Sequence, residues 1–371
     1  MFSYDVLNLI CAAGLSFVIT YILIPPIVRV ARAKNLYDSP GRRKPHKNDV
    51  PTLGGAAIFA GLVLAMTLFV DGKLAYQLRY FVAAAIIIFY IGIKDDILGL
   101  GPVKKLVAQI LSAIIIAVPA HVRFTSLHGF LGIHHIPDAY SVVLTVFVII
   151  VIINSFNLID GIDGLAALTG IIASSTFGVW FWLSGDYSYT IMAGALAGAL
   201  LAFLRFNLSS GKNKIFMGDT GALLIGLVLA ILAIRFNEAN VNAGIPWHLT
   251  SAPAVSIGIL ILPLFDTLRV FVLRMYRGDS PFRADKQHLH HRLLRLGLSH
   301  LQSTLILAGF CLVFISVAFI LDPIGVLPLT GILLVLAILL SLIPDMIYRK
   351  KRNNGLKVAE ADIVLKEEKA L

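Results

Sequence analysis

The chain has 371 residues, of which 58% are apolar and only 14% are charged, and its mean hydropathy is +0.87. A soluble domain carries about 45–50% apolar and about 25% charged residues. A single hydrophobic core cannot bury all of these apolar residues, because a chain of this length still leaves much of its surface facing solvent. The composition excludes a disordered chain, a collagen-like repeat and a disulfide scaffold, and it predicts a protein whose solvent is lipid.

Eleven stretches are long and apolar enough to cross the hydrocarbon core as helices, which takes about 20 residues each. In chain order they are 7–30, 53–70, 77–94, 103–120, 141–157, 164–184, 188–205, 219–236, 252–272, 302–321 and 327–348. Because Pro253 and Pro263 fall in one span, that helix is predicted to be kinked or broken. We therefore expect an all-α polytopic membrane protein, with one membrane-embedded domain over 1–348 and a charged tail over 349–371.

Basic residues are distributed unevenly between the predicted loops. Of the 31 Lys and Arg residues, 24 lie on the side of segment 31–52 and three lie on the other side. Cytoplasmic loops carry the excess of Lys and Arg, so the N-terminus is predicted to lie outside and the C-terminus in the cytoplasm. This distribution accounts for the net charge of +10 without a nucleic-acid partner.

Acidic side chains are costly in or beside a bilayer, and there they indicate function. Six aspartates lie at the predicted cytoplasmic ends of five spans, and they are Asp95, Asp96, Asp160, Asp163, Asp219 and Asp266. We expect them to meet at one membrane face, where most of the Lys and Arg residues also lie.

The adjacent pair Asp95 and Asp96 ends the third predicted span. Neighbouring carboxylates on a helix cannot point the same way, and their repulsion raises one pKa unless a cation neutralises them. A divalent metal or the nearby Lys105 would do this. A solvated helix end is the alternative interpretation.

A second polar group recurs every three residues, and it consists of Asn154, Asn157, Asp160 and Asp163. On a helix this spacing makes one polar stripe. Gly161 would let a ligand or another helix approach the backbone closely. A polar seam for helix packing is the alternative, but four such groups at the mouth of a membrane helix are too costly for packing alone.

The sequence Phe216-Met-Gly-Asp219-Thr-Gly opens another predicted span. Asp219 could be the N-cap of that helix, and a helix N-terminus with two glycines also suits a phosphate or its metal. The two roles are compatible. Hard oxygen ligands of this kind favour Mg²⁺ or Mn²⁺.

The longest predicted cytoplasmic loop contains four candidate phosphate-binding side chains: Arg274, His288, His290 and His291. Three histidines could indicate zinc, but no cysteine is close and the spacing fits no common structural zinc pattern. Donation to phosphate oxygens is the better interpretation. A basic face that contacts lipid headgroups is the alternative.

Together these motifs resemble the bacterial polyprenyl-phosphate N-acetylhexosamine-1-phosphate transferases, glycosyltransferase family 4. Five motifs carry the resemblance, in the order R-K-x-H-x-x-x-V-P-x-x-G-G (Arg43 to Gly55), the D-D pair, N-x-x-N-x-x-D-G-x-D-G-L, F-M-G-D-T-G and S-P-F-x-x-D-x-x-H-x-H-H. The resemblance extends over 38–300 and fits the eleven-span layout.

The resemblance implies an enzyme that transfers N-acetylglucosamine 1-phosphate from UDP-N-acetylglucosamine to undecaprenyl phosphate and releases UMP. It implies Mg²⁺ or Mn²⁺ as the cofactor and a bacterial plasma (inner) membrane location, with the active site on the cytoplasmic face. The product would begin a cell-surface polysaccharide such as wall teichoic acid, O antigen or common antigen. Membrane lipid is an expected partner, and a homodimer is compatible with this interpretation.

The resemblance also implies roles for individual residues. The candidate catalytic residues are Asp95, Asp96, Asp160, Asp163 and His288. The candidate substrate-binding residues are Lys105, Asn154, Arg274, His290 and His291. The candidate metal ligands are Asp219, Asn157 and Asp96. Within these sets, Asp95 would orient or deprotonate the acceptor phosphate, and Lys105 would neutralise the carboxylates.

Two other functions fit parts of the sequence. The phospho-N-acetylmuramoyl-pentapeptide transferases of peptidoglycan synthesis have three consecutive histidines where this chain has His-Leu-His-His, which favours a UDP-N-acetylhexosamine donor here. A transporter would place its carboxylates in mid-span, whereas these lie at span ends. A purely structural membrane protein gives no reason for six clustered carboxylates.

Overall fold

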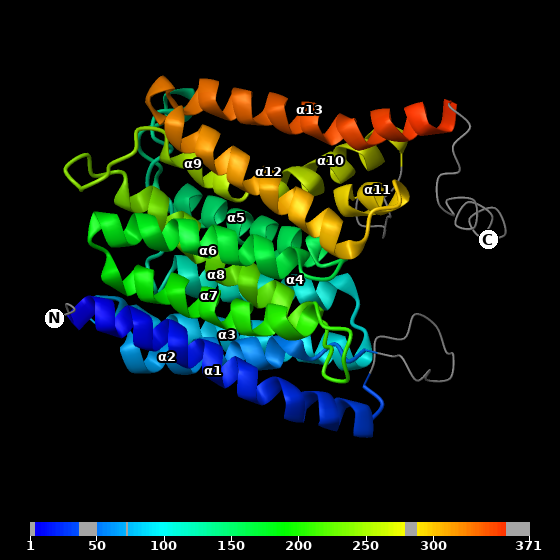
Figure 1. The fold of residues 1–371 in the computed structure, drawn as a ribbon. Helices are drawn as coiled ribbons and strands as arrows, with labels where there is room; N and C mark the ends of the chain where they lie inside the picture. The colour runs from blue at the N-terminus through cyan, green and yellow to red at the C-terminus, as the bar shows by residue number, and fades with distance from the viewer. Residues whose placement is uncertain (1–3, 37–49, 72, 279–287, 354–371) are drawn as a thin grey trace.

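The computed structural model describes residues 4–36, 50–71, 73–278 and 288–353, and the regular structure in these ranges is helical throughout. In chain order the helices are α1 (Tyr4–Ala33), α2 (Gly54–Phe69), α3 (Lys73–Leu98), α4 (Pro102–Ala117), η1 (Phe130–Gly132), α5 (Asp138–Ile159), α6 (Leu165–Ser184), α7 (Tyr187–Asn207), α8 (Gly218–Ala239), α9 (Ala252–Ile259), α10 (Ile261–Arg277), α11 (Leu289–Arg295), α12 (His300–Ile320), η2 (Asp322–Ile324) and α13 (Val326–Asn353). The long helices run side by side in one bundle (Figure 1).

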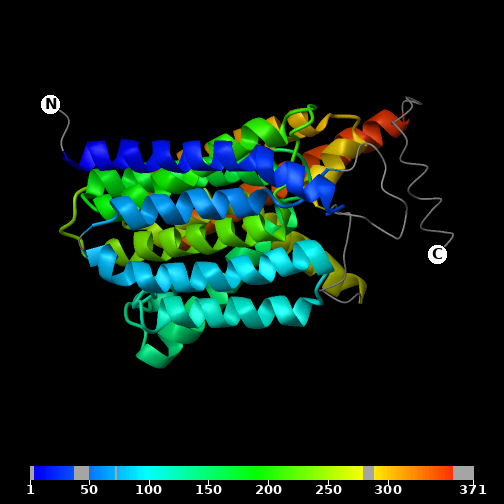
Figure 2. The same ribbon diagram turned by 90° about the horizontal axis from the view of Figure 1, so that it is seen from below.

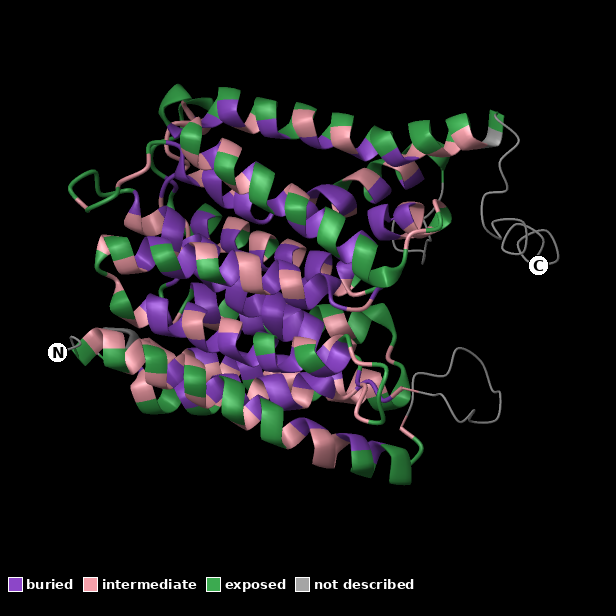
Figure 3. Ribbon diagram, viewed as in Figure 1, coloured by how far each residue is buried: buried purple, intermediate pink, exposed green. Residues whose placement is uncertain are grey.

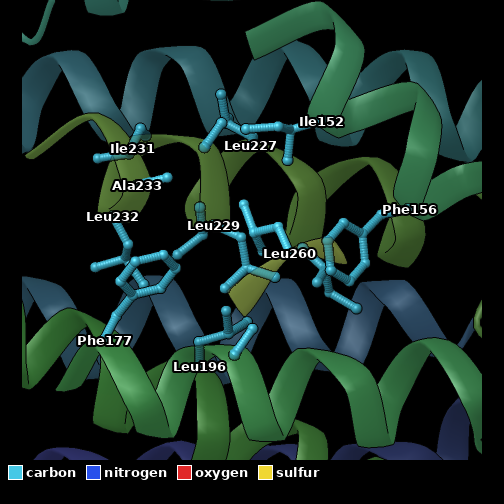
Figure 4. Close-up of a cluster of buried hydrophobic side chains, with 14 of the residues drawn as sticks. Ile152, Phe156, Phe177, Leu196, Leu227, Leu229, Ile231, Leu232, Ala233 and Leu260 are labelled. Atoms are coloured by element: carbon cyan, nitrogen blue, oxygen red, sulfur yellow. The ribbon is translucent and has the colours of Figure 1, made fainter. Parts of the chain in front are cut away.

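Helix α8 is the centre of this bundle. It is apolar on all sides, as expected of a helix with no solvent-facing side, and every residue from Thr220 to Ile234 is buried. Its side chains Leu227 and Ile231 pack among residues of α5, α6 and α7, such as Phe156 (Figure 4). Burial decreases outward, so that the outer faces of α1 and α13 are exposed (Figure 3). The exposed residues there are largely apolar, which is the pattern of a lipid-facing surface.

The all-α membrane architecture is confirmed. Each of the eleven predicted stretches is helical, and seven of the described helices are long and apolar enough to span a membrane, or eight with the bent pair α9 and α10. Helices α2 and α4 have only 16 residues each, and α3, although 26 residues long, is not among these candidate spans. The eleven-span count and its orientation therefore stay predictions, as does the separate status of the tail, since α13 continues to Asn353 and 354–371 lie outside the described residues.

The predicted break in the span 252–272 is present. Helices α9 and α10 meet at an angle of 83°, and Leu260 between them is non-helical. Pro263 lies in the first turn of α10, where its missing N–H removes no intrahelical hydrogen bond but prevents continuation from α9. The break directs α10 across α5 and toward α11.

The turns after α3, α5 and α7, and helix α11, lie at the same end of the bundle as the C-terminal end of α13 (Figures 1 and 2). The described N-terminal end of α1 lies at the other end. The described parts of the candidate motifs therefore share one end of the molecule, as the sequence predicted.

The close contact between α8 and α5 gives a test of this packing. A Cβ added to Gly226 would lie 2.5 Å from the Cα of Ile153, whereas a Cβ at Gly309 in α12 would meet no atom within 4 Å. We expect Gly226→Val to lower the Tm of the purified protein in detergent by about 5 °C or more, because overpacking a rigid core costs about 1–3 kcal/mol or more. Gly309→Val is the matched control, and equal Tm values for the two variants would contradict the packing.

Candidate active site

A cavity of about 490 Å³ opens at the end of the bundle where the motifs lie. Its walls come from the C-terminal ends of α3, α5 and α7, the turn between α5 and α6, the start of α8, the segments before α2 and α8, and the start of α12. The lining residues are Thr52, Asp95, Asp96, Gly99, Asn157, Asp160, Gly161, Ile162, Asp163, Asn207, Phe216, Met217, Gly218, Asp219 and His300. Five of the six predicted aspartates thus share one cavity, and Asp266 does not line it.

The N-terminus of α8 is the rear wall of the cavity, and Asp96 caps it. The carboxylate of Asp96 accepts hydrogen bonds from the backbone N–H of Asp219 (2.7 Å), the N–H of Thr220 (3.2 Å) and the hydroxyl of Thr220 (2.6 Å). These are amides that an α-helix leaves without internal partners. The interpretation of Asp219 as the N-cap was wrong: α8 begins at Gly218, so Asp219 lies inside the first turn and its side chain faces other groups.

The segment 51–55 is held against the start of α8 by its backbone. Phe216 N–H donates to the carbonyl of Pro51, and Gly54 N–H donates to the carbonyl of Phe216. A Cβ on Gly55 would lie 2.1 Å from the amide nitrogen of Gly221, so only glycine fits at this crossing. The final P-x-x-G-G of the first motif therefore fixes the position of F-M-G-D, whereas 37–49 lie outside the described residues.

Lys105 connects two carboxylates from distant parts of the chain. Its ammonium nitrogen lies 3.0 Å from Oδ2 of Asp95 and 2.6 Å from Oδ2 of Asp219. Asn157 donates its side-chain N–H to the other oxygen of Asp219 over 3.0 Å. The predicted neutralisation of the carboxylates by Lys105 is present in this geometry. The two adjacent aspartates point apart, because Asp96 faces the amides of α8.

The turn between α5 and α6 forms the next part of the wall. The predicted polar stripe over 154–163 was wrong in its second half, since α5 ends at Ile159 and the chain then turns. Gly164 closes the turn with a φ of 81°, and its N–H donates to the side-chain oxygen of Asn207. The turn lets Asp160 and Asp163 reach the same cavity without helical spacing.

Asp163 is paired with two cationic or protonatable groups. Its Oδ2 lies 2.7 Å from the ammonium of Lys214 and 3.3 Å from Nδ1 of His300. Within the described residues, no cationic side chain or histidine forms an ion pair with Asp160. Burial, with the negative charges of Asp219, Asp96 and Asp163, raises the pKa of Asp160 to about 7. A cation in the cavity would lower that pKa again, because it stabilises the ionised carboxylate.

The predicted phosphate-binding histidines lie behind the cavity wall. The ring of His290 packs against the Asp160–Gly161 turn, and a Cβ on Gly161 would lie 2.4 Å from its Nε2. Burial and the neighbouring His291 lower the pKa of His290 to about 3, so its ring is neutral at physiological pH. His288 and Arg274 are both buried and do not line the cavity.

Asn154 also lies away from the cavity. It exchanges side-chain hydrogen bonds with Gln109 of α4, one turn deeper than Asn157. This is the packing contact that the sequence left open as an alternative for the polar stripe. Asp285 of the fifth motif falls outside the described residues.

Sequence reasoning missed Lys214, His300 and Asn207. None of them belongs to a repeated spacing, and each comes from a segment that reaches the cavity only through the fold. A weak signal existed for His300, since the adjacent Ser299 and Gln302 form a capping box that places residue 300 at the start of α12. Lys214 stands only two residues before Phe216 of the fourth motif, over whose ring it lies.

The residues present fit a hard divalent cation. Asp95, Asp160 and Asp219 present carboxylate oxygens, and Mg²⁺ is commonly bound by one or two carboxylates together with substrate phosphates. Within the described residues no three acidic, histidine or cysteine side chains form a complete metal site. Asp96 fits less well than predicted, because both of its oxygens already accept hydrogen bonds from α8.

The arrangement suits the handling of phosphorylated reactants. A helix N-terminus, Lys105 and Lys214 supply positive potential in one cavity, and the carboxylates could hold a cation between them. The apolar bundle continues directly from the cavity, so one reactant could be anchored in lipid.

Known proteins match this chain over most of its length. Residues 78–237, which include α4 to α7 and most of α3 and α8, match Glycosyl transferase family 4. The undecaprenyl-phosphate alpha-N-acetylglucosaminyl 1-phosphate transferase of Salmonella typhi is 28% identical over 290 residues, which cover 77% of each chain. The corresponding protein of Escherichia coli is 26% identical over 302 residues, which cover 81% of this chain and 78% of the relative.

A mycobacterial relative is more similar in sequence. The decaprenyl-phosphate N-acetylglucosaminephosphotransferase of Mycobacterium tuberculosis is 31% identical over 314 residues, which cover 78% of this chain and 76% of the relative. The family match over 78–237 includes the ends of α3, α5 and α7 and the start of α8, which line the cavity. The chain therefore belongs to glycosyl transferase family 4, as a membrane-embedded polyprenyl-phosphate N-acetylhexosamine-1-phosphate transferase.

Proposed function

We propose that this protein transfers N-acetylglucosamine 1-phosphate from UDP-N-acetylglucosamine to undecaprenyl phosphate, giving undecaprenyl-diphospho-N-acetylglucosamine and UMP. The observation that carries the proposal is the joining of Asp95 and Asp219 through Lys105 at the N-terminus of α8. The bacterial relatives are named as N-acetylglucosamine 1-phosphate transferases that act on polyprenyl phosphates, and this supports the choice of substrates.

The reaction exchanges one phosphorus–oxygen bond for another. An oxygen of the acceptor phosphate forms a bond to the sugar-bearing phosphorus of the donor, and the bond from that phosphorus to the bridging oxygen breaks. The bridging oxygen leaves with UMP, so no oxidant, reductant or water is consumed. At about 4 Å and an effective dielectric constant near 20, two like unit charges repel by about 4 kcal/mol. Positive groups must offset this repulsion between the reactants and stabilise the transition state.

The chain's own residues supply that charge. Lys105 would move from the carboxylates to a phosphate oxygen when the donor binds, because its ammonium is the mobile cation between Asp95 and Asp219. The first amides of α8 already donate to the carboxylate of Asp96, which fixes the start of that helix against the cavity, so the positive charge for the phosphates would come from Lys105 and Lys214. Asp95 would orient the acceptor phosphate and needs to remove little or no proton, since a phosphate monoester is largely ionised near neutral pH.

Asp219, with Asp95 or Asp160, would hold Mg²⁺ or Mn²⁺ together with phosphate oxygens of the donor, and Asn157 would position the Asp219 carboxylate. The metal would neutralise charge on the diphosphate of the donor. The other end of the cavity, with Asp163, Lys214 and His300, would contact the sugar or uridine of the donor. Arg274, in the last turn of α10, and His291, in α11, stay candidates for the diphosphate, although neither lines the cavity in this structure.

The location follows from the distribution of charge. We propose that the cavity lies on the cytoplasmic face of a bacterial plasma membrane, where the basic loops are predicted. The acceptor phosphate would then sit at headgroup depth with its polyprenyl chain in lipid. The product would begin a cell-surface polysaccharide such as wall teichoic acid or O antigen.

A comparison of donors tests the substrate assignment. Purified protein reconstituted with undecaprenyl phosphate is expected to release UMP from UDP-N-acetylglucosamine far faster than from UDP-N-acetylmuramoyl-pentapeptide, because the loop sequence is His-Leu-His-His. UMP is measured by chromatography, and the lipid product is identified by mass spectrometry. Faster turnover of the muramoyl-pentapeptide would assign the protein to peptidoglycan synthesis instead.

A charge-neutral substitution tests the role of Asp219. Asp219→Asn keeps the shape of the side chain but removes the charge that faces Lys105, and we expect kcat to fall by about 100-fold or more with an unchanged Tm. Asp138→Asn is the matched control, since Asp138 pairs with Arg123 at the other end of the bundle and its side chain is 85% exposed. An Asp219→Asn variant with the kinetics of the wild type would show that this carboxylate has no part in transfer.

Removal of divalent cations tests the cofactor assignment. We expect UMP release to stop in excess EDTA and to return on addition of Mg²⁺ or Mn²⁺, because two anionic reactants must approach at this cavity. Tm in EDTA is the control for unfolding. Undiminished turnover in EDTA would contradict the assignment of a metal to the carboxylates.

A further inference from the structure

Asp266 is a buried carboxylate for which the proposed reaction has no use. It lies in α10, only 1% of its surface is exposed, and it does not line the cavity. A carboxylate in a membrane helix is costly unless other groups pair with it. Its place in the apolar bundle therefore requires an explanation from its contacts.

Both oxygens of Asp266 contact the start of α11. Oδ2 lies 2.9 Å from Nδ1 of His288, and Oδ1 accepts the backbone N–H of Leu289 over 3.0 Å. A third group, the guanidinium of Arg269, lies farther away, with Nη2 3.8 Å from Oδ1. One side chain thus holds a histidine ring and also satisfies one of the free N-terminal amides of α11.

The contact with Asp266 bears on which ring nitrogen of His288 carries a proton. An ionised carboxylate can only accept hydrogen bonds, so the ring nitrogen that faces it must carry a proton. With Asp266 ionised, His288 would present Nδ1–H to Oδ2 and leave Nε2 as the remaining position for a further contact. The same pairing restricts rotation of the ring, which is 4% exposed.

His288 reaches the cavity wall indirectly, through its contact with His290. The rings of His288 and His290 lie parallel, with 5.7 Å between their centres and an interplanar angle of 7°. His290 in turn packs on Gly161, a residue that lines the cavity, and its buried Nε2 has no hydrogen-bond partner in the described residues. A continuous series of contacts therefore leads from α10 to the turn that carries Asp160.

We propose that Asp266 is the positioning residue of the histidine run: it holds His288 and the start of α11 so that His290 supports the Asp160–Gly161 turn of the donor site. Asp266 is not catalytic, since it does not reach the cavity. The proposal rests on the proposed function in one respect, namely that this cavity binds the sugar-nucleotide donor.

A double-mutant cycle tests whether Asp266 acts through His288. We expect Asp266→Ala and His288→Ala each to raise KM for UDP-N-acetylglucosamine by about tenfold, the range of a hydrogen bond to a charged group. KM for undecaprenyl phosphate should stay within about twofold of the wild type. Because both changes break the same contact, the double variant should be no worse than either single variant.

Asp322 provides the matched control. It is another buried carboxylate, and it accepts the backbone N–H groups of Thr250 and Ser251 at the start of α9, away from the cavity. Asp322→Ala should lower Tm without changing KM for the donor. Equal rises of KM in Asp322→Ala and Asp266→Ala would mean that loss of any such cap disturbs the site, and the proposal would fail.

A conservative variant distinguishes loss of this contact from misfolding. Asp266→Asn keeps an oxygen for the Leu289 amide but presents an amide N–H to Nδ1 of His288, so it should preserve Tm and still raise KM for the donor. Asp266→Glu should restore part of the loss. Independent, multiplicative effects in the cycle, or a folded Asp266→Asn protein with the KM of the wild type, would overturn the proposal.

A second readout separates this proposal from the proposed function. The same cycle measured as Tm without substrates should also be non-additive, because the Asp266–His288 contact exists in the free protein. Suppose that wild-type protein releases no UMP from UDP-N-acetylglucosamine while the Tm changes of the double-mutant cycle are still non-additive. That result would refute the proposed function but would support the contact between Asp266 and His288. Additive Tm shifts would overturn the positioning role whatever the donor.

Discussion

The contact between Asp96 and the first amides of α8 is the constraint on which the site depends. Helix α8 is buried along almost its whole length, so its free N-terminal N–H groups need partners supplied by the protein. Asp96 satisfies the amides of Asp219 and Thr220, and in doing so it joins the end of α3 to the start of α8. The side chain of Asp219 is thereby left free of a capping role and is directed toward Lys105.

Charge balance follows from that arrangement. Five aspartates line one cavity beside a membrane, which would be strongly unfavourable without compensation. Lys105 offsets Asp95 and Asp219, and Lys214 with His300 offsets Asp163. Within the described residues Asp160 has no cationic partner, and burial with the neighbouring aspartates raises its pKa to about 7. The cavity therefore has capacity for one further cation, and the proposed reaction would require a divalent metal there.

Much of the architecture could be predicted from the sequence, because long apolar runs have one solution in lipid. The helices, the break near Pro263 and the convergence of distant aspartates all followed from composition and spacing. The positions and contacts of individual side chains could not be predicted in this way. The three-residue spacing of 154–163 predicted a helix throughout, but Gly164 allows a turn that periodicity does not reveal.

The same limit applies to the residues that were missed or misplaced. Asp219 was open to interpretation as a cap because a cap is usually local in sequence, whereas Asp96 caps α8 from 123 residues away. Lys214 and His300 reach Asp163 from two other segments, and no spacing within the chain encodes that meeting. The buried position of His288 depends on Asp266, a contact between α10 and the start of α11.

The most direct measurement of the central claim is an electron cryo-microscopy structure of the protein with Mg²⁺ and UDP-N-acetylglucosamine. The account predicts density for the diphosphate at the N-terminus of α8, with a metal against Asp219 and with Lys105 moved onto a phosphate oxygen. A diphosphate bound elsewhere, with Lys105 still between Asp95 and Asp219, would contradict it.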